Sequence, residues 1–124
     1  MRIFKTRLFA KWARAVKLTD KLLSHAVVEM ERGLIDADLG GCVYKKRIAL
    51  EGRGKRGGAR SIIAYMMTKK AFFIFGFAKN EKENVSPEEI KIAKAFASEL
   101  LSYGDEELKK LIKDNILIEV TYER

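Results

Sequence analysis

The chain of 124 residues is poor in the side chains that most often build disulfides and metal centres. It has one cysteine, Cys42, and one histidine, His25, so an internal disulfide is impossible and the ligand count excludes a classical zinc site. A single cysteine fits a reducing compartment, and we expect the protein to act in the cytoplasm. The residues present indicate neither a metal nor an organic cofactor.

Long hydrophobic runs are also missing. Basic residues interrupt the N-terminal apolar residues every few positions, at Lys5, Arg7, Lys11 and Arg14, which argues against a signal peptide. No apolar run approaches the ~18 residues that a membrane span needs. Internal repeats, linkers and low-complexity tracts are absent as well. With 48% apolar and 34% charged residues, the composition predicts one soluble globular domain over residues 1–124.

Acidic residues are scarce in one stretch, residues 43–60, which reads V-Y-K-K-R-I-A-L-E-G-R-G-K-R-G-G-A-R. Seven of its residues are basic and one is acidic, so it carries a net charge of +6, against +8 for the whole chain. The basic residues are Lys45, Lys46, Arg47, Arg53, Lys55, Arg56 and Arg60. Four glycines lie among them: Gly52, Gly54, Gly57 and Gly58.

This pattern predicts a basic strand over residues 43–50, a flexible basic loop, and a second strand that begins at Ala59 or Arg60. Glycine lets a backbone approach a phosphate closely, and arginine matches phosphate oxygens with two parallel donors. We therefore expect a nucleic-acid backbone as its partner. The alternative is a long solvated hairpin connection. A Walker phosphate loop fits poorly, because the glycines do not match G-x-x-x-x-G-K-[ST].

The rest of the chain predicts an α+β fold in which an antiparallel sheet has helices packed on one side. Strands are expected over residues 2–9, 43–50, 59–68, 71–79 and 116–120, and helices over residues 10–17, 19–33, 86–102 and 105–113. Residues 35–41 are expected to be a connection. Residues 71–79 contain four phenylalanines and predict a central strand buried on both faces, in preference to a stacking platform for bases.

Alternation along residues 43–50 places Lys45 and Arg47 on one face of the strand. Ile48 points to the other face and the core. Lys46 falls on that apolar side, and we expect its ammonium group to reach solvent near the start of the strand. His25 lies off the apolar stripe of its helix and is interpreted as a surface or boundary residue.

The order of these elements and two motifs together resemble the RelE superfamily of bacterial type II toxins, and within it the HigB-like members. The motifs are G-R-G-K-R-G-G-A-R at residues 52–60 and F-A-K-N-E-K-E-N-V-S at residues 77–86. The resemblance covers nearly the whole chain, from F-K-T-R through M-E-R-G to L-I-E-V. It implies a RelE-like fold, similar to microbial ribonucleases.

The activity implied by the resemblance is ribosome-dependent cleavage of mRNA by a toxin that a cognate antitoxin neutralises. We expect that antitoxin to carry a helix-turn-helix DNA-binding domain, and we expect no membrane partner. In the family's reaction a ribose 2′-hydroxyl attacks the adjacent phosphate and leaves a 2′,3′-cyclic phosphate. Lysine and arginine side chains supply the catalysis, without a histidine–glutamate pair.

The resemblance also assigns candidate residues. Arg60 is expected to stabilise the transition state, and Lys45, Lys55 and Lys79 are candidates for proton transfer. Phosphate-binding roles are assigned to Arg47, Arg53, Arg56, Asn80 and Lys82. The founding RelE-type enzyme has an arginine near the position of Asn80 and a catalytic tyrosine near that of Ser86, so the general acid and base stay open here. Neither Tyr65 nor Tyr103 fills the gap by alignment.

Two other functions remain open from the sequence. One is a non-catalytic RNA- or DNA-binding module that uses the same basic surface. The other is a ParE-like toxin of the same fold that poisons DNA gyrase. The basic strand face weighs against the gyrase poison, which has no need of a phosphate-binding cluster.

Overall fold

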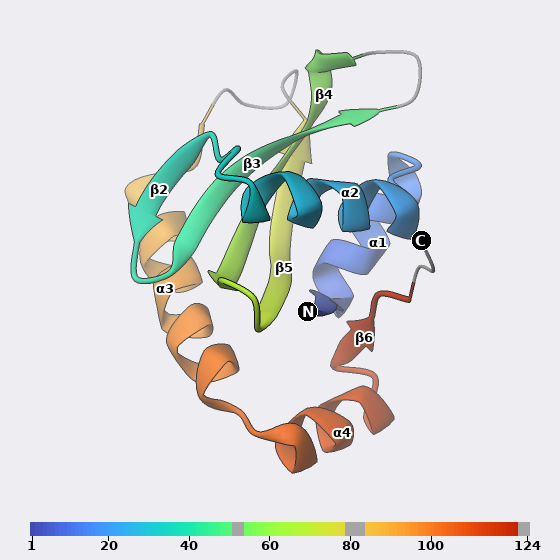
Figure 1. Ribbon diagram of the computed structural model, residues 1–124, viewed down its shortest axis with the longest axis vertical. Helices are drawn as coiled ribbons and strands as arrows, with labels where there is room; N and C mark the ends of the chain where they lie inside the picture. The colour runs from blue at the N-terminus through green and yellow to red at the C-terminus, as the bar shows by residue number, and fades with distance from the viewer. Residues whose placement is uncertain (51–53, 79–83, 122–124) are drawn as a thin grey trace.

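The computed structural model describes residues 1–50, 54–78 and 84–121, with side chains left out for residues 54–57. The strands are β1 (Arg2–Thr6), β2 (Ala37–Gly40), β3 (Val43–Leu50), β4 (Gly54–Met66), β5 (Lys70–Ala78) and β6 (Leu117–Glu119). The helices are α1 (Arg7–Ala15), α2 (Asp20–Glu31), α3 (Pro87–Ser102) and α4 (Asp105–Lys113). One sheet holds the strands in the order β2-β3-β4-β5-β1-β6 (Figure 1).

The predicted α+β class is confirmed, and so is the core of the sheet. Strands β3, β4 and β5 are adjacent and antiparallel. The expectation of a wholly antiparallel sheet is wrong, because β1 pairs with β5 in parallel. Strand β2 was expected to be part of a connection. It is a four-residue edge strand with one large apolar residue, Leu39, which gives a weak sequence signal.

Helices cover both faces of the sheet, which corrects the expectation of one covered face (Figure 1). One core cluster joins α1 and α2 to the sheet, and the other joins α3 and α4 to its opposite face. Strand β5 contributes to both, with Phe73 in the first cluster and Phe72 in the second, each fully buried. The predicted central position of this strand is therefore confirmed.

Capping residues set where the helices begin. The Thr19 and Ser86 side chains accept hydrogen bonds from the backbone at the starts of α2 and α3, as predicted. Thr6 does the same for α1 and accepts from the Phe9 nitrogen at 3.1 Å. The first strand therefore ends at Thr6, and the prediction of a strand to residue 9 is wrong. Phe9 joins the core from the helix, 5.2 Å from the Phe73 ring.

The helix α3 packs on the sheet through small residues. Ala93, Ala97 and Leu100 are buried at helical spacing, which brings the helix axis close to the strands. Phe96 is 48% exposed, because it lies at the flank of this buried row.

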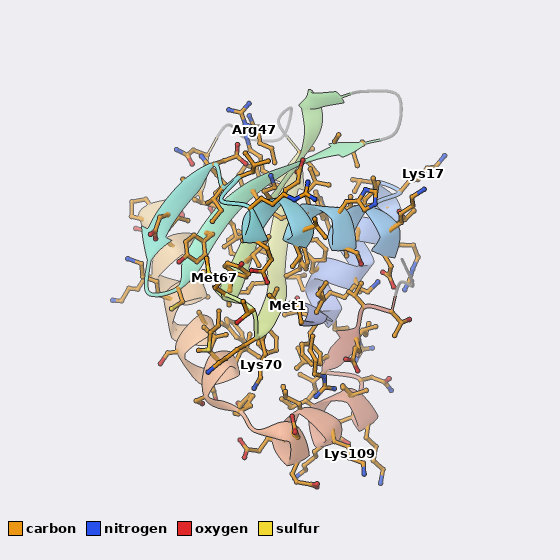
Figure 2. The ribbon with its side chains drawn as sticks, viewed as in Figure 1. Met1, Lys17, Arg47, Met67, Lys70 and Lys109 are labelled. Atoms are coloured by element: carbon orange, nitrogen blue, oxygen red, sulfur yellow. The ribbon has the colours of Figure 1, made fainter. Side chains whose placement is uncertain are left out.

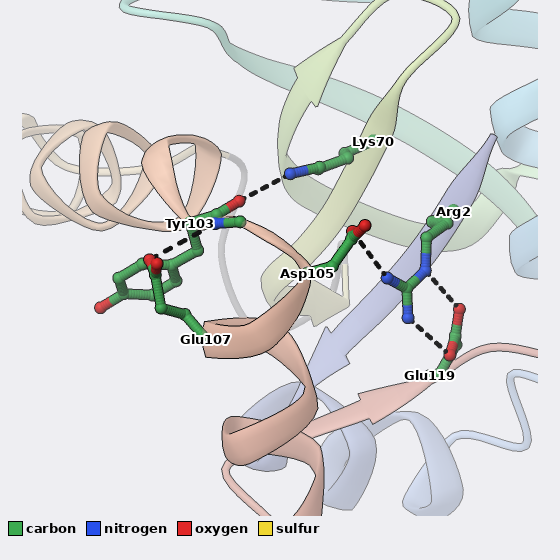
Figure 3. A network of polar contacts seen from close by, with 7 residues as sticks. Arg2, Lys70, Tyr103, Asp105, Glu107 and Glu119 are labelled. Atoms are coloured by element: carbon green, nitrogen blue, oxygen red, sulfur yellow. Dashed lines mark hydrogen bonds and ion pairs between the residues drawn. The ribbon is translucent and has the colours of Figure 1, made fainter.

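The C-terminal elements are held to the sheet by polar contacts (Figure 3). Arg2 donates two hydrogen bonds to the Glu119 carboxylate, at 3.0 and 3.1 Å, and approaches Asp105 at 3.5 Å. Lys70 donates to the Tyr103 carbonyl oxygen at 2.7 Å, next to the start of α4. These contacts tie the start of α4 and the short strand β6 to strands β1 and β5.

The long basic loop expected between β3 and β4 is largely strand. Strand β4 begins at Gly54, which pairs with Leu50, and a register shift follows before Ile48 pairs with Ala59. The glycine-rich sequence accommodates this irregularity, because glycine tolerates the backbone of a bulge. Lys55 and Arg56 therefore belong to a strand and not to a glycine-hinged loop.

Candidate nucleic-acid interface

Three cations gather on one face of the β3–β4 pair. Lys45 and Arg47 alternate on β3, and Arg60 on β4 lies directly opposite Arg47 in the register. This is the face that α3 covers, since Val43 and Ile62, which share it, belong to the α3-side core. Exposure rises along β3 from buried Val43 through half-buried Lys45 to exposed Arg47. Helix α3 therefore covers the Val43 end of this face more fully than the end that carries Arg47. The predicted sharing of one face by Lys45 and Arg47 is confirmed.

Arg60 is the unusual member of this strand-face cluster of Lys45, Arg47 and Arg60. Its residue is 8% exposed, and its Nη1 atom is buried without a hydrogen-bond partner in the described part of the chain. A buried donor left unpaired costs on the order of 1–3 kcal/mol, and more when it is charged. Like charges directly opposite on adjacent strands add to that cost. An anion between Arg47 and Arg60 would relieve both penalties.

Arg47 is oriented by the segment before β2. Its backbone nitrogen donates to Asp36 Oδ2 at 2.6 Å, and its Nε lies 3.5 Å from Asp36 Oδ1. The side chain extends into solvent at the upper end of the sheet (Figure 2). The Asp36 carboxylate pairs with Arg47 only, so the pair of Arg47 and Arg60 keeps an excess of positive charge.

Lys45 connects the strand face to the segment before α3. Its Nζ donates to Asn84 Oδ1 at 3.4 Å, and the same oxygen accepts from the Val85 nitrogen at 3.0 Å. Asn84 belongs to the second motif but was not singled out from the sequence. Its place in F-A-K-N-E-K-E-N-V-S was the available signal.

Lys46, the neighbour of Lys45, has a structural role. It is 2% exposed, and its Nζ lies 2.9 Å from Glu29 Oε1 on α2. The expectation that its ammonium group reaches solvent is wrong, because α2 covers this face of β3 and supplies a carboxylate. Burial of a lysine requires such a partner.

Several predicted residues lie where the structure gives no side chain. Arg53, Lys79, Asn80 and Lys82 are outside the described residues, and the side chains of Lys55 and Arg56 are not described. Ala78, the last described residue before the second motif's charged part, pairs with Ala59. The described chain therefore reaches this motif one position from Arg60.

Other ionisable groups lie elsewhere. The Tyr65 hydroxyl donates to Glu31 at 2.7 Å, and burial, together with this bond, raises its pKa. The Tyr103 hydroxyl donates to Glu99 at 2.8 Å, which raises its pKa as well. His25 is exposed on α2, on the opposite side of the sheet from Arg60, as expected for a surface histidine. Neither tyrosine is placed to serve the cluster.

The described residues form neither a metal-binding cluster nor a membrane-spanning helix. No group of three or more His, Cys, Asp or Glu side chains there is arranged to hold a metal ion. Within the same residues, every helix is too short or too polar to cross a membrane.

Comparison with known proteins gives one family. The family model described as the RelE toxin of the RelE/RelB toxin–antitoxin system matches residues 1–120. None of the curated proteins compared matches the sequence.

Proposed function

The chain belongs to the RelE toxin family, and on that premise we propose that it is a ribosome-dependent mRNA endoribonuclease. The family makes it a toxin of a toxin–antitoxin system with an antitoxin partner. The finer proposal is that it cleaves mRNA on the ribosome by attack of a ribose 2′-hydroxyl on the adjacent phosphate. We also propose the cytoplasm as its location, and an antitoxin that carries a helix-turn-helix domain.

The observation that carries this proposal is the buried Arg60 opposite Arg47, whose Nη1 atom has no hydrogen-bond partner among the described residues. The phosphorane formed in this reaction gathers negative charge on its nonbridging oxygens. A cation fixed by burial can meet that charge without reorganisation, and such donors lower the barrier by several kcal/mol. Arg47 is assigned the binding of the ground-state phosphate, because it is exposed and orientable.

Proton transfer needs one group near the 2′-hydroxyl and one near the leaving 5′-oxygen. Of the candidates Lys45, Lys55 and Lys79, Lys45 is supported by described geometry. It lies on the same strand face as Arg47 and is positioned by Asn84 at 3.4 Å. We assign Lys45 to one of the two transfers and keep Lys55 and Lys79 as candidates for the other.

The test is a reconstituted reaction with purified toxin, ribosomes and a defined mRNA, in which 5′ ends and 2′,3′-cyclic phosphates are mapped. The proposal expects cleavage in the ribosome-bound mRNA by the wild type, and a rate lowered by roughly 10²–10³ for Arg60→Ala at equal occupancy. Tight binding without cleavage by the wild type would favour a non-catalytic binding module. Gyrase inhibition with no RNA binding would favour the ParE-like alternative.

A further inference from the structure

A second group of cations lies on α1, away from the strand-face cluster. The first seventeen residues contain six basic side chains and no acidic one. Four of the six, Arg7, Lys11, Arg14 and Lys17, are exposed along α1 and its C-terminal end. The opposite side of this helix is buried through Phe9, Ala10 and Ala13. The helix therefore presents an almost wholly basic face to solvent, here called the α1 face.

These four cations have no ion pair with the described residues, unlike the other two. Arg2 is bound to Glu119, and Lys5 Nζ lies 2.8 Å from Asp20 Oδ1. Arg7, Lys11 and Arg14 follow one another at spacings of four and three, so they line one side of the helix. From Arg7 to Arg14 the row spans roughly 10 Å at the helical rise. Lys17 continues it past the helix end and points outward (Figure 2).

An open groove runs beside this row. It encloses about 740 Å³, with Arg7, Lys11 and Arg14 on one side and Asn115 and Ile118 from the C-terminal segment on the other. A second hollow of about 390 Å³ shares Arg14 and Ile118 and extends the groove toward Lys17. Among the described residues, Asp114 is the one carboxylate that lines the larger part, against three cations, and Asp20 lines the smaller hollow. The groove is suited to an extended anionic chain.

We infer that the α1 face is a second RNA-binding surface, which holds the phosphate backbone of an RNA segment other than the one being cleaved. Unpaired, exposed lysine and arginine rows recognise polyanions by releasing counterions, with no need of base contacts. A bilayer is a poorer partner, because the apolar side of α1 is buried in the core and only Leu8 is exposed beside the row.

The α1 face lies across the sheet from the strand-face cluster. Phe9 and Ala13 belong to the core on the α2 side, whereas Ile62, which shares the face of Arg60, belongs to the core on the α3 side. Lys17 and Arg47 accordingly project from separate parts of the molecule (Figure 2). One short strand placed at Arg60 does not also pass along α1. The inference rests on the proposed function for its choice of RNA. The same phosphate backbone is offered by ribosomal RNA and by a distant part of the mRNA.

The test compares two double variants that remove the same charge. Lys11→Gln/Arg14→Gln alters the α1 face, and Lys109→Gln/Lys113→Gln alters exposed lysines of α4 as a control. Binding is measured over a range of salt concentrations with purified ribosomes, with a mixed-sequence RNA duplex and with single-stranded RNA of equal length. The α1 variant is expected to lose roughly tenfold or more in affinity and about two units of salt slope, and the control much less.

The outcomes separate this inference from the proposed function, because binding is scored without cleavage. A loss confined to ribosomes and duplex identifies ribosomal RNA, and a loss confined to the single strand identifies mRNA. Equal losses of affinity in both double variants, or unchanged binding in the α1 variant, would overturn the inference. Either result would leave the proposed role of Arg60 in mRNA cleavage intact. Reduced binding of poly-L-glutamate with unchanged RNA binding would also overturn it, in favour of an acidic protein segment. Absence of cleavage with the expected binding loss would defeat the proposed function alone.

Discussion

The two basic regions of this toxin hold their cations in opposite ways. In the strand-face cluster Arg60 is buried, and its Nη1 atom has no hydrogen-bond partner among the described residues. Arg47 and Lys45 are oriented by Asp36 and Asn84. On the α1 face the cations are exposed and form no ion pair with the described residues. The two regions differ in how firmly their side chains are held and not in the sign of their charge, since both are strongly positive.

This contrast predicts a division of labour. A buried guanidinium has already lost its solvent and its rotamer freedom, so it stabilises a charge that develops at one point. Exposed lysines and arginines keep both, and they attract a polyanion over a broad surface with little geometric demand. We therefore expect the rate of the chemical step to depend on the strand-face cluster, and affinity to depend mainly on the α1 face.

The largest effect is expected for Arg60→Ala. Loss of one fixed transition-state donor should lower the single-turnover cleavage rate by roughly 10²–10³, with a small change in ribosome affinity. Arg60→Lys is the matched variant, because it keeps the charge but loses the planar fork, and it should recover only part of the rate. Near wild-type cleavage by Arg60→Ala would remove this residue from the mechanism.

The next effect is on the stability of the fold and concerns Lys46, a cation that belongs to neither basic region. Lys46 is buried and paired with Glu29, whose side chain is 33% exposed. Glu29→Ala should lower the free energy of unfolding by about 2–3 kcal/mol, below the usual range for a fully buried pair. Replacing both residues, as Lys46→Met/Glu29→Leu, should restore most of the loss. Urea unfolding of the wild type and the two variants measures this, and a double variant no more stable than Glu29→Ala would show that the pair is not coupled.

A smaller effect is expected at Asp36, which orients Arg47. Asp36→Asn keeps the side-chain oxygen that accepts from the Arg47 nitrogen but removes the charge. Loss of this ion pair should change the substrate concentration for half-maximal cleavage by a few-fold, because exposed ion pairs contribute less than about 1 kcal/mol. The saturated rate should stay nearly unchanged. A large fall in the saturated rate would move Arg47 from binding to chemistry.

The smallest effect at neutral pH concerns Tyr65, which lies outside both regions. Burial and the bond to Glu31 raise its pKa above the usual value near 10. Above pH 10 the unfolded chain loses this proton while the folded protein keeps it. Stability should therefore fall as pH rises above 10, by up to about 1.4 kcal/mol per pH unit from this group. Tyr65→Phe should flatten that fall relative to wild type in unfolding experiments at pH 8–11.

Sequence reasoning reached the elements that local signals determine. The capping box at Ser86, the alternation that unites Lys45 and Arg47, and the apolar strand around Phe72 each depend on a few neighbouring residues. The RelE resemblance added the choice of Arg60, and the family match supports the resemblance itself. The burial of Arg60 and its unpaired Nη1 atom depend on packing and were not predictable from the sequence.

The errors came from contacts between distant segments. The parallel pairing of β1 with β5, the edge strand β2 and the Glu29 partner of Lys46 all depend on residues far apart in the chain. The basic residues of α1 were read as interruptions of an apolar stretch. Their alignment on one exposed helix face depends on the cap at Thr6, because the helix begins at Arg7 and not at residue 10 as predicted.

The most direct test of the division of labour is a pair of measurements on two variants, Arg60→Ala and Lys11→Gln/Arg14→Gln. Ribosome affinity is measured first, and single-turnover cleavage is then measured at toxin concentrations that saturate each variant. The account predicts a large loss of rate with near-normal affinity for Arg60→Ala, and weaker binding with a near-normal saturated rate for the α1 double variant. A saturated rate that falls more in the α1 variant than in Arg60→Ala would contradict it.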